Sequence, residues 1–133
     1  MKNYETKESL EKLLENEGFV KTNNISVISA TETTCTLRME IKDNIKNPYQ
    51  IVHGGATFGL GDTVMGMTTR MFGKKSVTLN SHISYLRPGT GKYLDATSEI
   101  IKKGKNICVL RANIYNDSNI LVAVMEGTYS YID

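Results

Sequence analysis

The sequence predicts an α+β fold in which a curved antiparallel sheet wraps one long helix. Two observations carry this prediction. Between residues 54 and 72 apolar side chains surround the helix instead of forming one stripe, which is typical of a buried helix. After residue 76, apolar and polar side chains alternate in segments joined by short turns, which is typical of antiparallel strands. The 133 residues contain no linker, repeat or low-complexity tract, so we expect a single domain over residues 1–133.

The segment before the long helix is expected to supply a short N-terminal helix and two strands. Over residues 6–19, Leu10, Leu13 and Leu14 fall on one helical face. Gly18 is expected to end this helix in the left-handed conformation. Apolar side chains then alternate with polar ones between residues 25 and 41, which predicts two strands with a turn near 31–33.

The long helix contains three glycines that need an explanation. Gly59, Gly61 and Gly66 each weaken a helix by about 1 kcal/mol relative to alanine. The simplest reason for keeping them is a close approach of other backbone. Gly73, followed by two lysines that suit the negative end of the helix dipole, is expected to end the helix.

The rest of the chain is expected to form an antiparallel meander. Alternation predicts strands over residues 77–85, 94–100, 108–114 and 120–131. Turns fall between them at 87–89, 102–105 and 116–119. Because these connections are short, we expect consecutive strands to pair, with the sheet curled around the helix.

Composition excludes several classes of protein. The formal net charge of +2, from 16 basic and 14 acidic residues, is too even for a nucleic-acid-binding protein. No apolar run is long enough for a membrane span, and the N-terminus lacks the apolar region of a signal peptide, so a cytoplasmic location is expected. Cys35 and Cys108 lie among aliphatic residues and belong to no CxxC pair, which favours buried, reduced thiols over a disulfide or a nucleophile.

Asp62 is the first candidate for chemistry. It lies two turns inside the long helix, too far from its start to act as an N-cap, and an unpaired charge facing a dry core is very costly. One alternative is a solvent-facing edge beside Thr69 and Arg70. Because the surrounding faces are apolar or glycine, we favour a general base or nucleophile instead.

The turn His53-Gly54-Gly55 is the second candidate. Its glycines open the helix, so the free backbone N–H groups of the first turn and the positive end of the dipole could hold an oxyanion or polarise a carbonyl. Taken alone, the turn could also be an ordinary glycine-rich one. Asn47 could donate to the same carbonyl or to water, or could be a plain turn residue beside Pro48. No metal is expected, because no Cys or acid stands at ligand spacing from His53.

These residues carry a resemblance to a known family. The patterns resemble the hotdog-fold acyl-CoA thioesterases of the phenylacetyl-CoA (PaaI-like) type, and the likeness extends over about residues 15–132. The matching patterns are Asn47-x5-His53-Gly54-Gly55-x6-Asp62, Thr78-x-Asn80-x-x-Ile83-x-Tyr85-Leu86-Arg87-Pro88 and Gly104-Lys105. In that family an antiparallel sheet wraps a long central helix, and two subunits form a continuous sheet with each active site at the dimer interface.

The resemblance implies a role for five residues. Asp62 would be the general base or nucleophile, and the Gly54 N–H would polarise the thioester carbonyl. His53 would orient the turn, and Asn47 would position the carbonyl or the attacking water. Thr78 would face the acid across the interface and help to hold water.

Substrate contacts are expected from further residues. Arg87 and Lys105 are candidates for the negative charges of coenzyme A, although each could be a solvated surface charge. Met67 could line an acyl pocket or belong to the core, as could Phe58, Met65 and Met71. Gly55 and Gln50 would lie beside the substrate; many relatives have glycine at the position of Gln50, so this residue could narrow the acyl entrance.

The resemblance therefore implies an acyl-CoA thioesterase that forms a homodimer or a dimer of dimers. It would need no cofactor beyond the coenzyme A of its small-molecule substrate. The alternatives are a non-catalytic module that binds acyl-CoA or an acyl carrier, and a hydratase or dehydratase on the same fold. A mere binder has no need of a base, and hydratases space their Asp/His pair differently. The acyl group, the choice between direct attack and activation of water, and the choice between dimer and tetramer stay open at this point.

Overall fold

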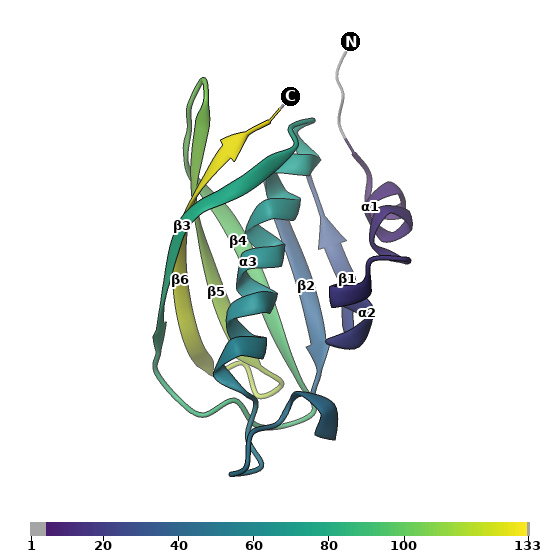
Figure 1. Cartoon of the computed structure of the whole chain (residues 1–133), viewed down its shortest axis with the longest axis vertical. Helices are drawn as coiled ribbons and strands as arrows, with labels where there is room; N and C mark the ends of the chain where they lie inside the picture. Colours follow the sequence, from purple (N-terminus) through teal and green to yellow (C-terminus); the bar gives the residue numbers. More distant parts are fainter. Residues whose placement is uncertain (1–4, 133) are drawn as a thin grey trace.

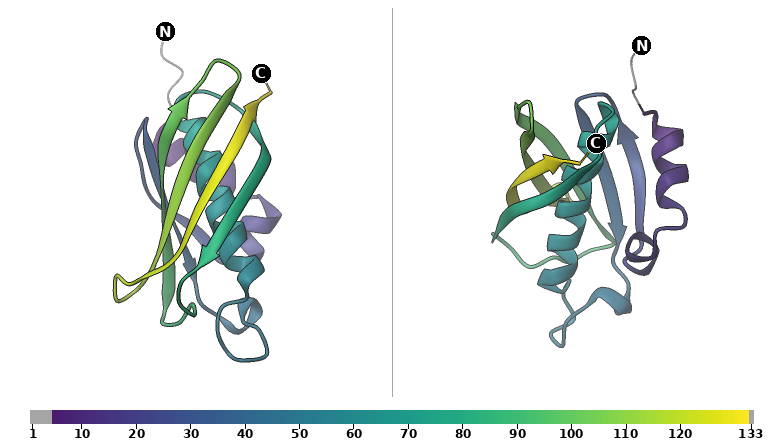
Figure 2. Two further views of the ribbon diagram at one scale, coloured as in Figure 1. Left: turned by 90° about the vertical axis from the view of Figure 1, so that its left-hand side faces the viewer. Right: turned by 45° about the horizontal axis from the view of Figure 1, so that its top comes forward.

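The computed structural model describes residues 5–132 and shows the expected α+β architecture. One curved antiparallel sheet, with the strand order β1-β2-β4-β5-β6-β3, wraps the long helix α3 (Figures 1 and 2). The short helices α1 and α2 lie beyond β1 (Figure 1). The helices are α1 (Lys7–Leu14), α2 (Gly18–Thr22), the 3-10 turn η1 (Asp43–Ile45) and α3 (Gly54–Met71), and the strands are β1 (Ile25–Ala30), β2 (Thr34–Glu40), β3 (Ser76–Tyr85), β4 (Tyr93–Lys103), β5 (Ile107–Asn116) and β6 (Leu121–Tyr131).

The helix α3 lies in the core, as its composition predicts. Its sheet-facing residues are almost completely buried, and Gly73 ends it with a positive φ of 87°. Two of its glycines are explained by close packing, although side chains rather than backbone make the approach. A Cβ at Gly59 would overlap the ring of Phe19, and a Cβ at Gly61 would overlap the sulfur of Met125. Gly66 has no such neighbour, since its nearest contact would be the Tyr129 ring at 3.8 Å.

The prediction for the end of the N-terminal helix is wrong. The helix α1 already ends at Leu14, and Gly18 begins α2 instead of closing α1. The cause is Glu17, whose carboxylate accepts the Val20 N–H at 2.6 Å and so caps a new helix start. Leu13, expected on the buried face, is 47% exposed.

The position of β3 differs from the predicted meander. β4, β5 and β6 do pair consecutively, but β3 pairs with β6 and lies at the far edge of the sheet from β1. Alternation along a strand reports which face is buried and carries no information on which strand is its neighbour. As a result β3 has one free edge, and its side chains Val77 and Leu79 are 47% and 58% exposed.

A bulge interrupts β3. Thr78 pairs with Tyr129 and Asn80 with Thr128, so Leu79 is an extra residue without a partner on β6. Bulges bend a strand and change the direction in which its side chains point.

The two cysteines are buried and free, as expected. Burial raises the pKa of the Cys35 thiol to about 12 and also raises the pKa of Cys108, so neither is a ready nucleophile. Within residues 5–132, none of the helices combines the length and apolar character needed to cross a membrane.

Candidate active site

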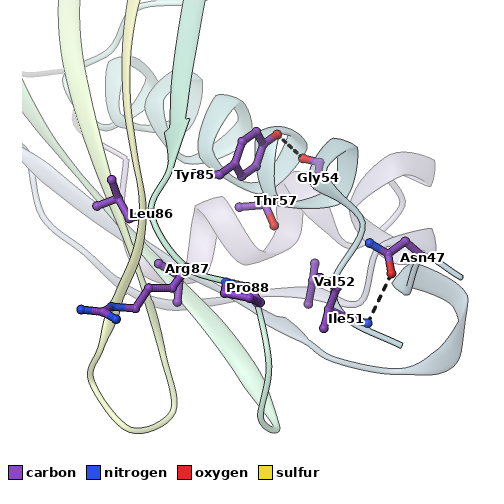
Figure 3. Close-up of a pocket in the computed structure, with 11 residues that line it drawn as sticks. Asn47, Ile51, Val52, Gly54, Thr57, Tyr85, Leu86, Arg87 and Pro88 are labelled. Carbon is purple, nitrogen blue, oxygen red and sulfur yellow. Dashed lines mark hydrogen bonds between the residues drawn. The ribbon is translucent and has the colours of Figure 1, made fainter. Parts of the chain in front are cut away.

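A first hollow, of about 350 Å³, opens at the start of α3 (Figure 3). It lies between the loop that precedes the helix and the segment that follows β3. Its lining residues are Asn47, Ile51, Val52, Gly54, Thr57, Tyr85, Leu86, Arg87, Pro88, Gly89 and Val122.

Contacts at the helix start explain the His-Gly-Gly turn. The Nδ1 atom of His53 accepts the Gly55 N–H at 2.9 Å, so His53 is the N-cap of α3. The Tyr85 hydroxyl donates to the Gly54 carbonyl at 2.6 Å. A Cβ at Gly54 would approach the Tyr85 hydroxyl to 3.2 Å, and one at Gly55 would approach Nδ1 of His53 to 3.0 Å, so a side chain at either position would require a small shift of its neighbour.

The Gly54 N–H remains available at this helix start. Among residues 5–132 it has no hydrogen-bond partner, whereas the N–H groups of Ala56 and Thr57 bond the His53 carbonyl. The positive end of the helix dipole adds to the potential at the same point. The turn therefore presents one aligned donor to a carbonyl oxygen or an oxyanion.

Asn47 organises the loop that precedes the helix, and its role toward a carbonyl or water stays a prediction. Its Oδ1 accepts the Tyr49 N–H at 2.9 Å and the Ile51 N–H at 3.4 Å, which organises the turn. Because Oδ1 is the acceptor, the Nδ2 group is left as a donor, and it is turned away from Ile51 in Figure 3. Gln50, where many relatives have glycine, adopts a left-handed backbone with φ of 64°, so the loop keeps a conformation that glycine adopts without strain.

Thr57 is a member of this site that sequence reasoning missed. It is only 4% exposed, and its hydroxyl points into the hollow (Figure 3). Its position one turn after Gly54 places it on the same helical face, which is the signal that could have found it. Arg87 lines the same hollow as predicted. Lys105 does not, because it lies in the β4–β5 turn at the opposite end of the sheet.

A second hollow, a groove of about 480 Å³, holds Asp62. Thr78 Oγ1 donates to Oδ1 of Asp62 at 2.8 Å, and the Tyr129 hydroxyl donates to the same oxygen at 2.7 Å. Within the described chain Oδ2 of Asp62 has no hydrogen-bond partner. The carboxylate is thus held by one oxygen and presents the other.

Two features of this acid differ from expectation. Thr78 bonds Asp62 within one chain, whereas the resemblance places that contact across an interface; the pairing of β3 with β6 brings Thr78 over the helix of its own subunit. Tyr129 was not foreseen. Its hydroxyl is kept protonated, because burial, with further contributions from the Asp62 hydrogen bond and charge, raises the pKa of Tyr129 well above its usual value.

The groove has a mixed lining. Met67, a predicted substrate contact, is on its wall, whereas Met65 and Met71 are buried in the core. The lining residues are Leu13, Leu14, Glu17, Val20, Asp62, Thr63, Gly66, Met67, Ser76, Val77, Thr78 and Tyr129. Across residues 5–132, no group of three or more His, Cys, Asp or Glu side chains lies close enough to hold a metal ion.

The two hollows are separate in one chain. Gly54 and Asp62 belong to the same helix, and at a rise of about 1.5 Å per residue they lie about 12 Å apart along its axis. A donor and a base that act on one carbonyl carbon must both lie within about 3 Å of the reacting atoms. The two groups of a single chain therefore do not meet on one substrate.

Fold and site together define a class. The sequence matches the thioesterase superfamily over residues 49–123, more than half of the chain, and the protein belongs to this superfamily of hotdog-fold thioester hydrolases.

Its relatives fall within the same class. The acyl-coenzyme A thioesterase PaaI of Escherichia coli is 31% identical over 86% of this chain and 83% of its own length. The structure of that protein superposes with a TM-score of 0.85 over 92% of this chain and 89% of its own, at 28% identity. A thioesterase from Haemophilus influenzae, 27% identical, superposes with a TM-score of 0.91 over 99% of this chain and 94% of its own. The structure of a hypothetical thioesterase from Streptococcus pneumoniae with coenzyme A, 26% identical, superposes with a TM-score of 0.78 over 81% of this chain and 88% of its own.

Proposed function

We propose that this protein hydrolyses acyl-CoA thioesters at sites that two copies of the chain share. The observation that carries the proposal is the separation of two unsatisfied groups on one helix. The Gly54 N–H and Oδ2 of Asp62 have the chemistry that a thioesterase needs but lie about 12 Å apart on α3. A two-fold axis beside the helix would bring each group opposite its counterpart on the second copy.

The free edge of β3 supports such a dimer. β3 pairs with β6 along one side, and among the described strands none pairs with its other side. The strand also exposes Val77 and Leu79. Two β3 edges can pair antiparallel about a two-fold axis and extend the sheet across both subunits. Dimers could pair further into tetramers through other surfaces.

In this arrangement the Gly54 N–H binds the thioester oxygen of the substrate, and the Asn47 amide, which lines the same hollow, donates to this oxygen or to water. The partner's Asp62 takes a proton from a water molecule, whose oxygen attacks the carbonyl carbon. The negative charge that develops on the carbonyl oxygen is stabilised by the N–H and the helix dipole. The C–S bond then breaks, the sulfur of coenzyme A takes up a proton, and the free acid leaves. Direct attack by Oδ2, followed by hydrolysis of the anhydride, uses the same groups.

The two hydrogen bonds to Oδ1 give Asp62 its orientation. Thr78 and Tyr129 hold one oxygen from two different strands, so Oδ2 points in one fixed direction. A non-catalytic binding module has no need of such an arrangement.

The coenzyme A portion would lie over the first hollow. Arg87 lines it and can meet a phosphate of the substrate. Lys105 is far from the Gly54 hollow of its own chain, so a contribution from it would have to be made to the site of another subunit. The reaction uses no cofactor other than the coenzyme A that the substrate carries.

The test is thiol release from a panel of acyl-CoAs, with the wild type and Asp62→Ala compared at matched protein concentration. We expect the variant to lose at least about 1000-fold in kcat while light scattering still shows the dimer. Binding of acyl-CoA without turnover by the wild type would favour the non-catalytic module. Equal turnover by both proteins would refute the role of Asp62.

A further inference from the structure

The groove that holds Asp62 is walled on one side by the N-terminal helices. Leu13 and Leu14 of α1, with Val20 of α2 and its N-cap Glu17, line it, and α3, β3 and Tyr129 of β6 supply the rest of the lining. These helices precede the segment, residues 49–123, that matches the superfamily. This wall is therefore a feature of the chain outside the matched segment.

The charges along the groove have one sign. Its charged lining residues are Asp62 and Glu17, and among the lining residues that the structure describes there is no lysine, arginine or histidine. The Glu17 carboxylate is fixed in place, because it accepts the Val20 N–H that caps α2. A second carboxylate brought into the groove would meet like charge and find no cation.

The floor of the groove is kept open by Gly66. A Cβ there would touch only the Tyr129 ring, at an ordinary 3.8 Å, so no contact within the chain requires glycine. Glycine nevertheless weakens a helix relative to alanine. Space for something outside the chain is a reason to keep it, and Gly66 lies on the groove beside Asp62.

From these observations we propose that the groove binds the acyl group, and that α1 and α2 select neutral, apolar acyl chains and reject acyl chains that end in a carboxylate. The inference rests on the proposed function, since the occupant is the acyl part of the thioester on which Asp62 acts. Leu13, Met67 and Val77 supply the apolar contact. Each methylene buried against them should raise kcat/KM about fourfold until the groove is filled.

The test compares octanoyl-CoA with 7-carboxyheptanoyl-CoA, which has the same chain length and a terminal carboxylate. For the wild type we expect kcat/KM to be at least about 100-fold higher with octanoyl-CoA. Leu13→Lys places a cation on the wall and should raise the relative rate with the carboxylated substrate about tenfold. Ile101→Lys is the matched control, because Ile101 is also 47% exposed and lies on β4 outside the groove. Equal rates for the two substrates with the wild type would overturn the proposal.

A binding measurement separates this inference from the proposed function. Calorimetry with the non-hydrolysable thioethers S-octyl-CoA and S-(7-carboxyheptyl)-CoA needs no turnover. Preference for the octyl compound in a protein that hydrolyses nothing would support the acyl site and refute the thioesterase activity. Equal affinities for the two thioethers in an active enzyme would support the thioesterase activity and refute the acyl selectivity of the groove.

Two further variants complete the test. Gly66→Ala should lower kcat/KM for octanoyl-CoA several-fold more than for acetyl-CoA, because the added methyl group narrows the groove only where a long chain lies. Light scattering of Leu13→Lys tests whether the second subunit, instead of the acyl chain, occupies the groove. If this variant dissociates the dimer instead of changing selectivity, the groove is filled by the second subunit and the proposal is wrong.

Discussion

The two hollows of this protein use the same helix in different ways. At its start, α3 contributes backbone: the functional group is an N–H, and glycines at positions 54 and 55 keep side chains out of the way. Two turns later it contributes a side chain, Asp62, which hydroxyl groups from β3 and β6 hold in place. The donor of the first hollow is therefore set up by neighbours in the sequence, His53 and Gly55, whereas the orientation of Asp62 in the second depends on the topology of the sheet.

The largest expected effect tests the backbone group. Gly54→Pro removes the N–H but suits the first position of a helix, and His53 already has the extended conformation that a following proline requires, with φ −59° and ψ 133°. We expect kcat to fall by about 100- to 1000-fold. Gly54→Ala, which adds the same Cβ beside Tyr85 and keeps the N–H, should lose only several-fold. Similar losses in the two variants would assign the effect to crowding.

Mixing inactive variants tests whether the two hollows meet across subunits. Gly54→Pro and Asp62→Ala subunits, refolded together in equal amounts, should recover about a quarter of wild-type activity, since half of the dimers are mixed and each has one intact site. Refolding each variant alone is the control. Failure of the mixture to recover activity, with mixed dimers shown by mass spectrometry, would contradict a shared site.

A smaller effect is expected where two donors share one acceptor. Tyr129→Phe removes one hydrogen bond to Oδ1 and should lower kcat by about 10- to 100-fold with little change in KM. Tyr131→Phe, on the same strand with its ring against Phe72, is the matched control and should retain activity. An unchanged kcat in Tyr129→Phe would show that Thr78 alone orients the acid.

The same tyrosine should make stability sensitive to alkali. The folded-state pKa of Tyr129 is raised above its ordinary value of 10.0, mainly by burial, so its contribution to stability is complete below about pH 10 and is lost as the pH rises further. Above that pH the free energy of unfolding of the wild type should fall more steeply than that of Tyr129→Phe, by up to about 1.4 kcal/mol per pH unit. Urea titrations of both proteins at several alkaline pH values measure the difference. The same pH dependence of the free energy of unfolding in both proteins would contradict a raised pKa for Tyr129.

The smallest effect concerns the loop before α3. Gln50 has a left-handed backbone, φ 64°, so Gln50→Gly should raise the free energy of unfolding by up to about 1 kcal/mol. Thermal and urea unfolding measure the gain. Activity should change little if the loop keeps its shape, whereas a large change in KM would indicate that the Gln50 side chain contacts the substrate.

The difference between the hollows also explains what the sequence could predict. The helix, its ends and the turn at His53 follow from local patterns, and Asn47, Gly54 and Arg87 do line one hollow. Tyr129 could not be foreseen, because it reaches Asp62 only through the pairing of β3 with β6, which alternation does not reveal. The prediction that Gly18 ends the first helix is wrong for a local reason, because Glu17 caps the start of a new helix there. Tyr85 belongs to the pattern Thr78–Pro88 that carries the resemblance, but nothing in the sequence indicates its hydrogen bond to the Gly54 carbonyl.

The extra residue in β3 has a consequence for both hollows. In an uninterrupted strand, Thr78 and Tyr85 are separated by an odd number of positions and would point to opposite faces. Leu79 resets the phase, so that both side chains reach the helix, Thr78 at Asp62 and Tyr85 at Gly54. One unpaired residue thus allows β3 to contact α3 at two sites two helical turns apart. Deletion of Leu79 would turn either Thr78 or Tyr85 away from the helix, so only one of the two contacts would remain.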